Sequence, residues 1–142
     1  MKIFILYLFI LVNNSQQKDF HISIRYYSKP IISHEWSISI FRVGGNIYIN
    51  ALDYMDRTIN KKEIPRRYYP QLIDRLNKCG IWILKDYYRK GSHNGYYLIR
   101  VEKGRHHNSI RVEAGVPLLG QNARYLEIIR SVENVVRVGL YD

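Results

Sequence analysis

The sequence predicts an α+β domain, namely an antiparallel sheet built from two hairpin-helix halves with two helices packed on one face. Short segments alternate apolar and polar residues, which is the period of a half-buried strand, and most of these segments are joined by short turns. Two further segments instead repeat their apolar residues with the helical period of 3.6. Because strands joined by short turns run antiparallel, the sheet is expected to be antiparallel, with the helices covering it.

The first half contains a strand at residues 21–26 and a hairpin. Residues 36–40 alternate, with Trp36 on the apolar face, and the return strand is expected at 47–51. Gly44-Gly45 is typical of the tight turn between them, because glycine accepts the positive φ that such turns need. The polar and basic segment 57–67 is expected to be a loop.

The first helix is predicted from an apolar stripe that ends at Cys79 and is followed by Gly80, a typical helix stop. Pro70 leaves two possible starts. The helix begins there with proline in its first turn, or it begins near Arg66 and is kinked. Cys79 is the single cysteine, so no intrachain disulfide can form, and its place on the stripe predicts a small buried hydrophobe.

The second half begins with an apolar segment, residues 81–84, that is predicted to be a strand. Residues 96–102 and 110–114 are predicted to pair as a hairpin. The last helix is predicted from the apolar stripe between residues 125 and 136, and Asn122 is its expected N-cap.

The N-terminus predicts export. Met1-Lys2 precedes ten residues, 3–12, that are apolar except for Tyr7, and this pattern is typical of a secretory signal. The run is short for a membrane helix, which needs about 20 apolar residues. We therefore expect a signal at residues 1–15 and a single domain at 20–142 that is periplasmic or secreted, without a membrane span in the mature chain. An uncleaved anchor and a buried first element are the alternatives.

The positive charge is concentrated in the middle of the chain. The formal net charge is +10, and residues 57–111 alone hold fourteen cations against four anions. Cations interleaved with tyrosines are typical of surfaces that bind polyanions, such as envelope polymers or nucleic acid. A solvated basic surface without a partner is the alternative. The candidate anion contacts are Lys61, Lys62, Arg66, Arg67, Arg89 and Arg105.

Two other functions are compatible with the sequence. A secreted phosphodiester hydrolase would use His106 or His107, or His93 in the preceding loop, as an acid–base beside a carboxylate. A periplasmic interaction module would recognise another protein through a sheet edge or an apolar patch. No motif for a nucleotide, a small-molecule cofactor or a metal ion is present, and we expect neither a cofactor nor catalytic activity.

The charged residues of the second hairpin are predicted to pair with one another. Arg111 and Glu113 alternate on one strand, and Arg100 and Glu102 alternate on the other. Facing opposite charges are common as cross-strand pairs, so we expect these four to be structural.

Overall fold

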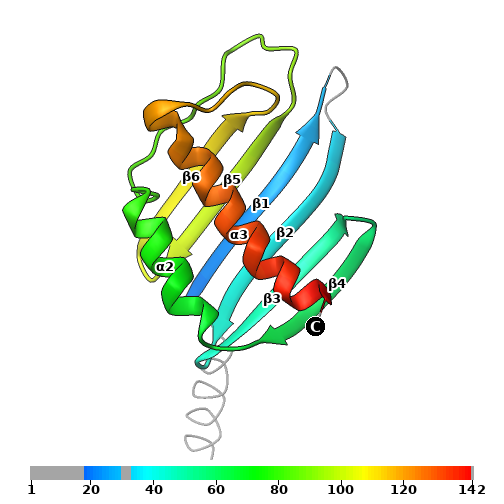
Figure 1. Cartoon of the computed structure of the whole chain (residues 1–142), viewed down its shortest axis with the longest axis vertical. Helices are drawn as coiled ribbons and strands as arrows, with labels where there is room; N and C mark the ends of the chain where they lie inside the picture. The colour runs from blue at the N-terminus through cyan, green and yellow to red at the C-terminus, as the bar shows by residue number, and fades with distance from the viewer. Residues whose placement is uncertain (1–17, 30–32, 142) are drawn as a thin grey trace, which may run out of the picture.

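The computed structural model describes residues 18–29 and 33–141 and has an α+β fold (Figure 1). A single sheet of six strands, all antiparallel, has the order β4-β3-β2-β1-β5-β6. The elements are, in chain order, β1 (Phe20–Ser28), β2 (Ser33–Val43), β3 (Asn46–Tyr54), β4 (Arg57–Ile64), α2 (Tyr68–Lys78), β5 (Tyr96–Lys103), β6 (His106–Glu113), a 3₁₀ turn η1 (Gly120–Asn122) and α3 (Ala123–Tyr141).

Both helices lie over the same face of the sheet, with α3 crossing the strands diagonally and α2 beside it (Figure 1). The core fills the space between these two layers. It is made of alternate side chains of the strands, such as Ile22 and Ile24 of β1, together with the apolar stripes of the helices, such as Leu72 and Val132. The period-2 pattern therefore determines which side chains are left on the opposite face of the sheet.

Several predicted elements are confirmed. Val43 pairs with Asn46 across the turn at Gly44-Gly45, and both glycines have positive φ. Cys79 is buried, and Gly80, at φ 69°, follows the end of α2. Pro70 is the third residue of α2 and lies in its first turn, where an amide N–H has no partner within the helix, so a helix that starts at Tyr68 accepts it.

Residues 57–64 form a strand, β4, and the prediction of a loop there was wrong. An edge strand needs few apolar side chains, and in β4 Ile59 and Ile64 contact the core. The pairing is irregular, because Asn50 of β3 faces both Asn60 and Lys61, and Lys61 has φ 50°. Four strands thus precede α2 and two precede α3, so the two parts of the chain are not equal hairpin-helix units.

Residues 81–84 form turns, and the predicted strand there is also wrong. Ile81 and Leu84 are buried, whereas Ile83 is 82% exposed, which is not the alternation of a strand. The segment is fixed instead by Asn108 of β6, whose side-chain amide donates to the carbonyls of Ile81 (2.8 Å) and Leu84 (3.0 Å).

The predicted signal at residues 1–15 lies outside the described residues. Within the ranges 18–29 and 33–141, no helix has both the length and the apolar composition needed to cross a membrane.

Candidate functional site

The face of the sheet opposite α2 and α3 carries polar, charged and aromatic side chains on all of its central strands. We call it the helix-free face, because neither of these helices packs against it (Figure 1). The strand register aligns its residues in rows, so that Ser39, Ser23, Arg100 and Ser109 are neighbours across four strands. Its main members are His21, Ser23, Arg25, Tyr27, Ser37, Ser39, Phe41, Tyr48, Asn50, Tyr96, Leu98, Arg100, Glu102, His107, Ser109 and Arg111.

A polar depression of about 510 Å³ lies over β1 to β4 on this face. Its floor contains Ser23 and Ser39, which are only 8% and 9% exposed because longer side chains surround them. The hydroxyl and amide groups in the depression can donate hydrogen bonds to the oxygens of an anionic group. The polar lining residues are His21, Ser23, Arg25, Ser37, Ser39, Asn50, Thr58 and Asn60.

Arg25 lines this depression, and Arg100 and Arg111 lie on the next two strands of the sheet, β5 and β6. Arg25 is opposite Leu98, Leu98 is opposite Arg111, and Arg100 is two residues beyond Leu98 on the same strand. With strands about 4.8 Å apart and a rise of about 3.3 Å per residue, the three Cα atoms are about 8–10 Å from one another. All three side chains are exposed, and none forms an ion pair with a carboxylate of residues 18–29 or 33–141. We call Arg25, Arg100 and Arg111 the arginine triangle.

An aromatic row borders the face near the β2–β3 turn. The rings of Phe41 and Tyr48 are stacked, with centroids 5.4 Å apart. The ammonium group of Lys18 lies 4.5 Å from the centroid of Phe41, and that of Lys61 lies 5.3 Å from the centroid of Tyr48. Each ring therefore holds a lysine beside it through a cation–π contact.

A second aromatic cluster borders the opposite end of the strands. Tyr27 and Tyr96 are stacked at 5.0 Å, and Tyr88 meets Tyr96 edge-on at 5.3 Å. The guanidinium of Arg111 lies 5.1 Å from the Tyr96 centroid and 5.4 Å from that of Tyr88. Lys29 donates to the Tyr88 hydroxyl and, at 2.8 Å, to the carbonyl of Ser92. This cluster therefore restricts the position of the Arg111 guanidinium, one of the three in the arginine triangle.

His21 lies between the aromatic row and the depression. Burial is the main cause that lowers the pKa of its imidazole below 6.5, and the positive charge of Lys18 acts in the same direction. The opposing effect of Glu102, its cross-strand neighbour, is smaller. His21 is therefore neutral at pH 7.

Glu113 is only 4% exposed and holds the loop that precedes β5. Its Oε2 lies 3.6 Å from Nη2 of Arg89. A hydrogen bond from Ser92, followed by the charge of Arg89, lowers the pKa of Glu113 below its usual value. The predicted cross-strand charge pairs are thus wrong: Arg100 faces Ser109, Arg111 faces Leu98, and Glu113 faces Tyr96. In the register of β5 with β6, Glu102 faces His107, which is four residues from Arg111. Arg100 faces Ser109, which is four residues from Glu113.

The six predicted anion contacts are distributed over three places. Lys61 borders the helix-free face, and Arg89 is paired with Glu113 at the far end of the strands. Lys62 points to the other side of the sheet, where its Nζ donates to the carbonyl of Gly139, 2.6 Å away, in the last turn of α3.

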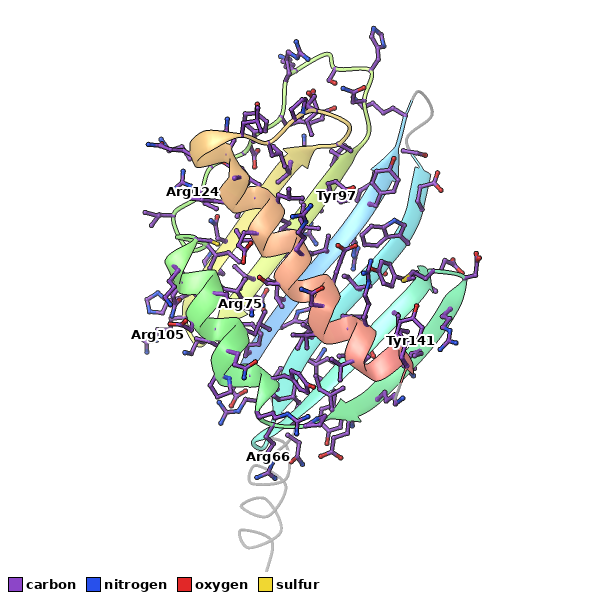
Figure 2. All side chains as sticks on the ribbon, viewed as in Figure 1. Arg66, Arg75, Tyr97, Arg105, Arg124 and Tyr141 are labelled. Atoms are coloured by element: carbon purple, nitrogen blue, oxygen red, sulfur yellow. The ribbon has the colours of Figure 1, made fainter. Side chains whose placement is uncertain are left out.

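The other three lie at the end of the sheet where β1 begins. Arg66 donates two hydrogen bonds, of 2.6 and 3.1 Å, to the side-chain oxygen of Asn46, and Arg67 lies over its neighbour Tyr68. Arg105 occupies the β5–β6 turn. In Figure 2, Arg66 lies at the bottom of the molecule and Arg105 at its left edge. The predicted residues do not form one patch.

The sequence-based prediction does not include Lys18 or Arg25, because both lie outside the segment of highest positive charge, and it assigns Arg100 and Arg111 to cross-strand pairs. The alternation of residues 21–26 contains the missing signal, because it places Arg25 on the polar side of a strand. No sequence feature shows that Arg25 and Arg100 meet, since the two residues are 75 positions apart along the chain and their strands pair only in the fold.

The histidines of the hydrolase alternative do not form a site. His93, His106 and His107 are exposed, and no hydrogen bond joins any of them to a carboxylate in the part of the chain that the structure describes. The same residues contain no group of three or more His, Cys, Asp and Glu side chains that could hold a metal ion.

The sequence matches no model of a known protein family, and no curated protein is significantly similar to it.

Proposed function

We propose that this protein is an exported, non-catalytic domain, periplasmic or secreted, that binds an anionic partner through the helix-free face. The observation that carries the proposal is the arginine triangle: three exposed arginines on one sheet face, with Cα atoms about 8–10 Å apart, whose guanidinium groups form no ion pair with a carboxylate of the described residues. Lys18 and Lys61 extend the positive surface along one border of the face.

The physical basis is electrostatic. A surface that replaces the counterions of a polyanion gains affinity from their release, and the affinity falls with salt in proportion to the number of contacts. The depression adds hydroxyl and amide groups that can donate hydrogen bonds to the oxygens of an acidic group. The acidic group could accept these hydrogen bonds without displacing a large apolar side chain. Paired cations such as Arg89 and Lys62 contribute less, since a partner would have to replace contacts that they already make.

The test is retention on heparin and on phosphocellulose, together with the affinity for a labelled heparin fragment over a series of salt concentrations. The variants Arg25→Gln, Arg100→Gln and Arg111→Gln each remove one corner of the triangle. Arg75→Gln is the matched control, because Arg75 is an exposed arginine on α2, on the other side of the sheet (Figure 2).

We expect each triangle variant to lower the affinity and to reduce the slope of log affinity against log salt concentration by about 1, the value for one lost contact. The control variant should change the affinity and the slope only as much as removing one distant positive charge does. If Arg75→Gln has the same effect as the triangle variants, binding follows net charge and the helix-free face is not the site. Loss of binding in the triangle variants with a normal melting temperature supports the proposal.

A further inference from the structure

The aromatic rings on the helix-free face are already in contact with neighbours from their own chain. Tyr48 has Phe41 on one side, at 5.4 Å, and the ammonium of Lys61 near its ring, at 5.3 Å. Phe41 is only 4% exposed. The Phe41 ring is therefore closed to an approaching partner, and the Tyr48 ring already has a neighbouring ring and a neighbouring lysine.

The second cluster has the same character. Tyr96 is stacked on Tyr27 at 5.0 Å, is met by the edge of Tyr88 at 5.3 Å, and has the guanidinium of Arg111 at 5.1 Å. A nucleobase that stacked on Tyr96 would have to displace one of these groups. The contacts instead position Arg111, because a ring beside a guanidinium restricts where that guanidinium can lie.

The depression between the two clusters offers hydrogen-bond donors without a stacking surface. Among the described residues that line it, none is Phe, Tyr or Trp, whereas six are Ser, Thr or Asn in addition to Arg25 and His21. Binding of single-stranded nucleic acid without sequence preference usually combines a basic groove with aromatic side chains on which successive bases stack. The helix-free face has the positive charge of such a groove, but its rings are occupied.

We propose that the anionic partner is a polymer recognised through its acidic groups alone, without contribution from aromatic bases: a phosphate-bearing polymer such as a polyphosphate or an envelope glycopolymer. This inference rests on the proposed function, since it specifies the chemistry of the partner that the same face binds. The arginine triangle and the donors of the depression contact the acidic groups, and the tyrosines hold cations in place.

The test compares a thymidine oligonucleotide with an abasic strand of the same length and charge, with linear polyphosphate as a third probe. We expect the two strands to bind with the same affinity within about twofold, and polyphosphate to bind at least as tightly at equal charge. Stacking of even one base is worth about 5- to 160-fold. A thymidine strand that binds about fivefold or more tightly than the abasic strand overturns the inference and leaves the proposed function intact. Absence of salt-sensitive binding to all three probes overturns the proposed function itself.

The variants Tyr48→Leu and Tyr96→Leu give a second readout. If the rings only position cations, each variant lowers the affinity for the thymidine strand and for the abasic strand by the same factor. The ratio of the two affinities does not depend on how much folded protein each variant yields. A variant that weakens only the thymidine strand shows that its ring stacks on a base, and contradicts the inference.

Discussion

Lys61 and Lys62 are adjacent in β4, and the structure gives them different roles. The Nζ of Lys62 is 2.6 Å from the carbonyl oxygen of Gly139 in the last turn of α3. Lys61 lies on the other side of the strand, beside Tyr48, with its ammonium group exposed. Replacing each by glutamine removes the same charge from the same segment, so the pair separates a structural lysine from a binding lysine.

The expected loss for Lys62→Gln is about 1–2 kcal/mol of unfolding free energy. A hydrogen bond from a charged donor contributes about 1.5–3 kcal/mol, and a cation at a helix C-terminus about 0.3–1 kcal/mol. The carbonyls at the end of a helix have no partners within the helix and regain water when the lysine is removed, which reduces the total. Arg57 also remains, and it donates to the carbonyl of Leu140. In a domain of this size, the loss corresponds to a melting temperature about 4–8 °C lower.

The assay measures thermal and urea unfolding of both variants and, in parallel, their affinities for the heparin fragment. We expect Lys62→Gln to lower the stability with an affinity close to that of the wild type, and Lys61→Gln to lower the affinity severalfold with an unchanged urea midpoint. The reverse pattern, or equal effects of both variants on affinity, would refute the assignment of the two lysines to opposite sides of the sheet.

Three further outcomes follow from the packing and the titratable groups. Gly139→Ala places a Cβ 2.2 Å from Cδ1 of Ile49, so we expect a loss of about 1–2 kcal/mol in urea unfolding, partly recovered by adding Ile49→Val, which removes that methyl group. Glu113→Gln should lower the melting temperature at neutral pH. The difference from the wild type should begin to shrink as the pH falls below about 4.5, and it should disappear only below the lowered pKa of the folded carboxyl, because the carboxyl stabilises the fold only while it is ionised. The wild type should lose stability relative to His21→Gln as the pH is lowered below 6.5, because the unfolded histidine takes up its proton first. A constant difference between either titration variant and the wild type across these pH ranges would contradict the assigned cause.

Elements with a strong periodic pattern could be predicted from the sequence. The hairpin around Gly44-Gly45, the helix that stops at Gly80, and the inward positions of Ile110 and Val112 are local features, and the structure contains each of them. β4 could not be predicted, because an edge strand pairs on one side only and satisfies its backbone with few apolar residues. The strand prediction for residues 81–84 was wrong because their apolar composition does not require a strand: a run of four apolar residues can reach the core through turns.

The site was less accessible to prediction than the fold. The density of positive charge along the chain predicts that residues 57–111 contain the anion contacts, but the position of a cation in the sequence does not show whether it already has a partner in the fold. Lys62, Arg66 and Arg89 make contacts with Gly139, Asn46 and Glu113 that only the tertiary structure creates. The strands that carry the arginine triangle are far apart in the chain, so their meeting depends on the pairing of β1 with β5.

The antiparallel pairing of the first strand with β5 is therefore the feature that links this fold to its proposed role. Because β1 lies between β2 and β5, it brings Arg25 next to the hairpin that carries Arg100 and Arg111. Both helices cover the other side of the sheet, so the three arginines face solvent together rather than a packed layer. Some cations of the chain, such as Lys62 and Arg89, already contact groups within the fold, whereas the guanidinium groups of the arginine triangle form no ion pair with a carboxylate of the described residues. A partner that supplies acidic groups at this face would complete contacts that these residues leave open.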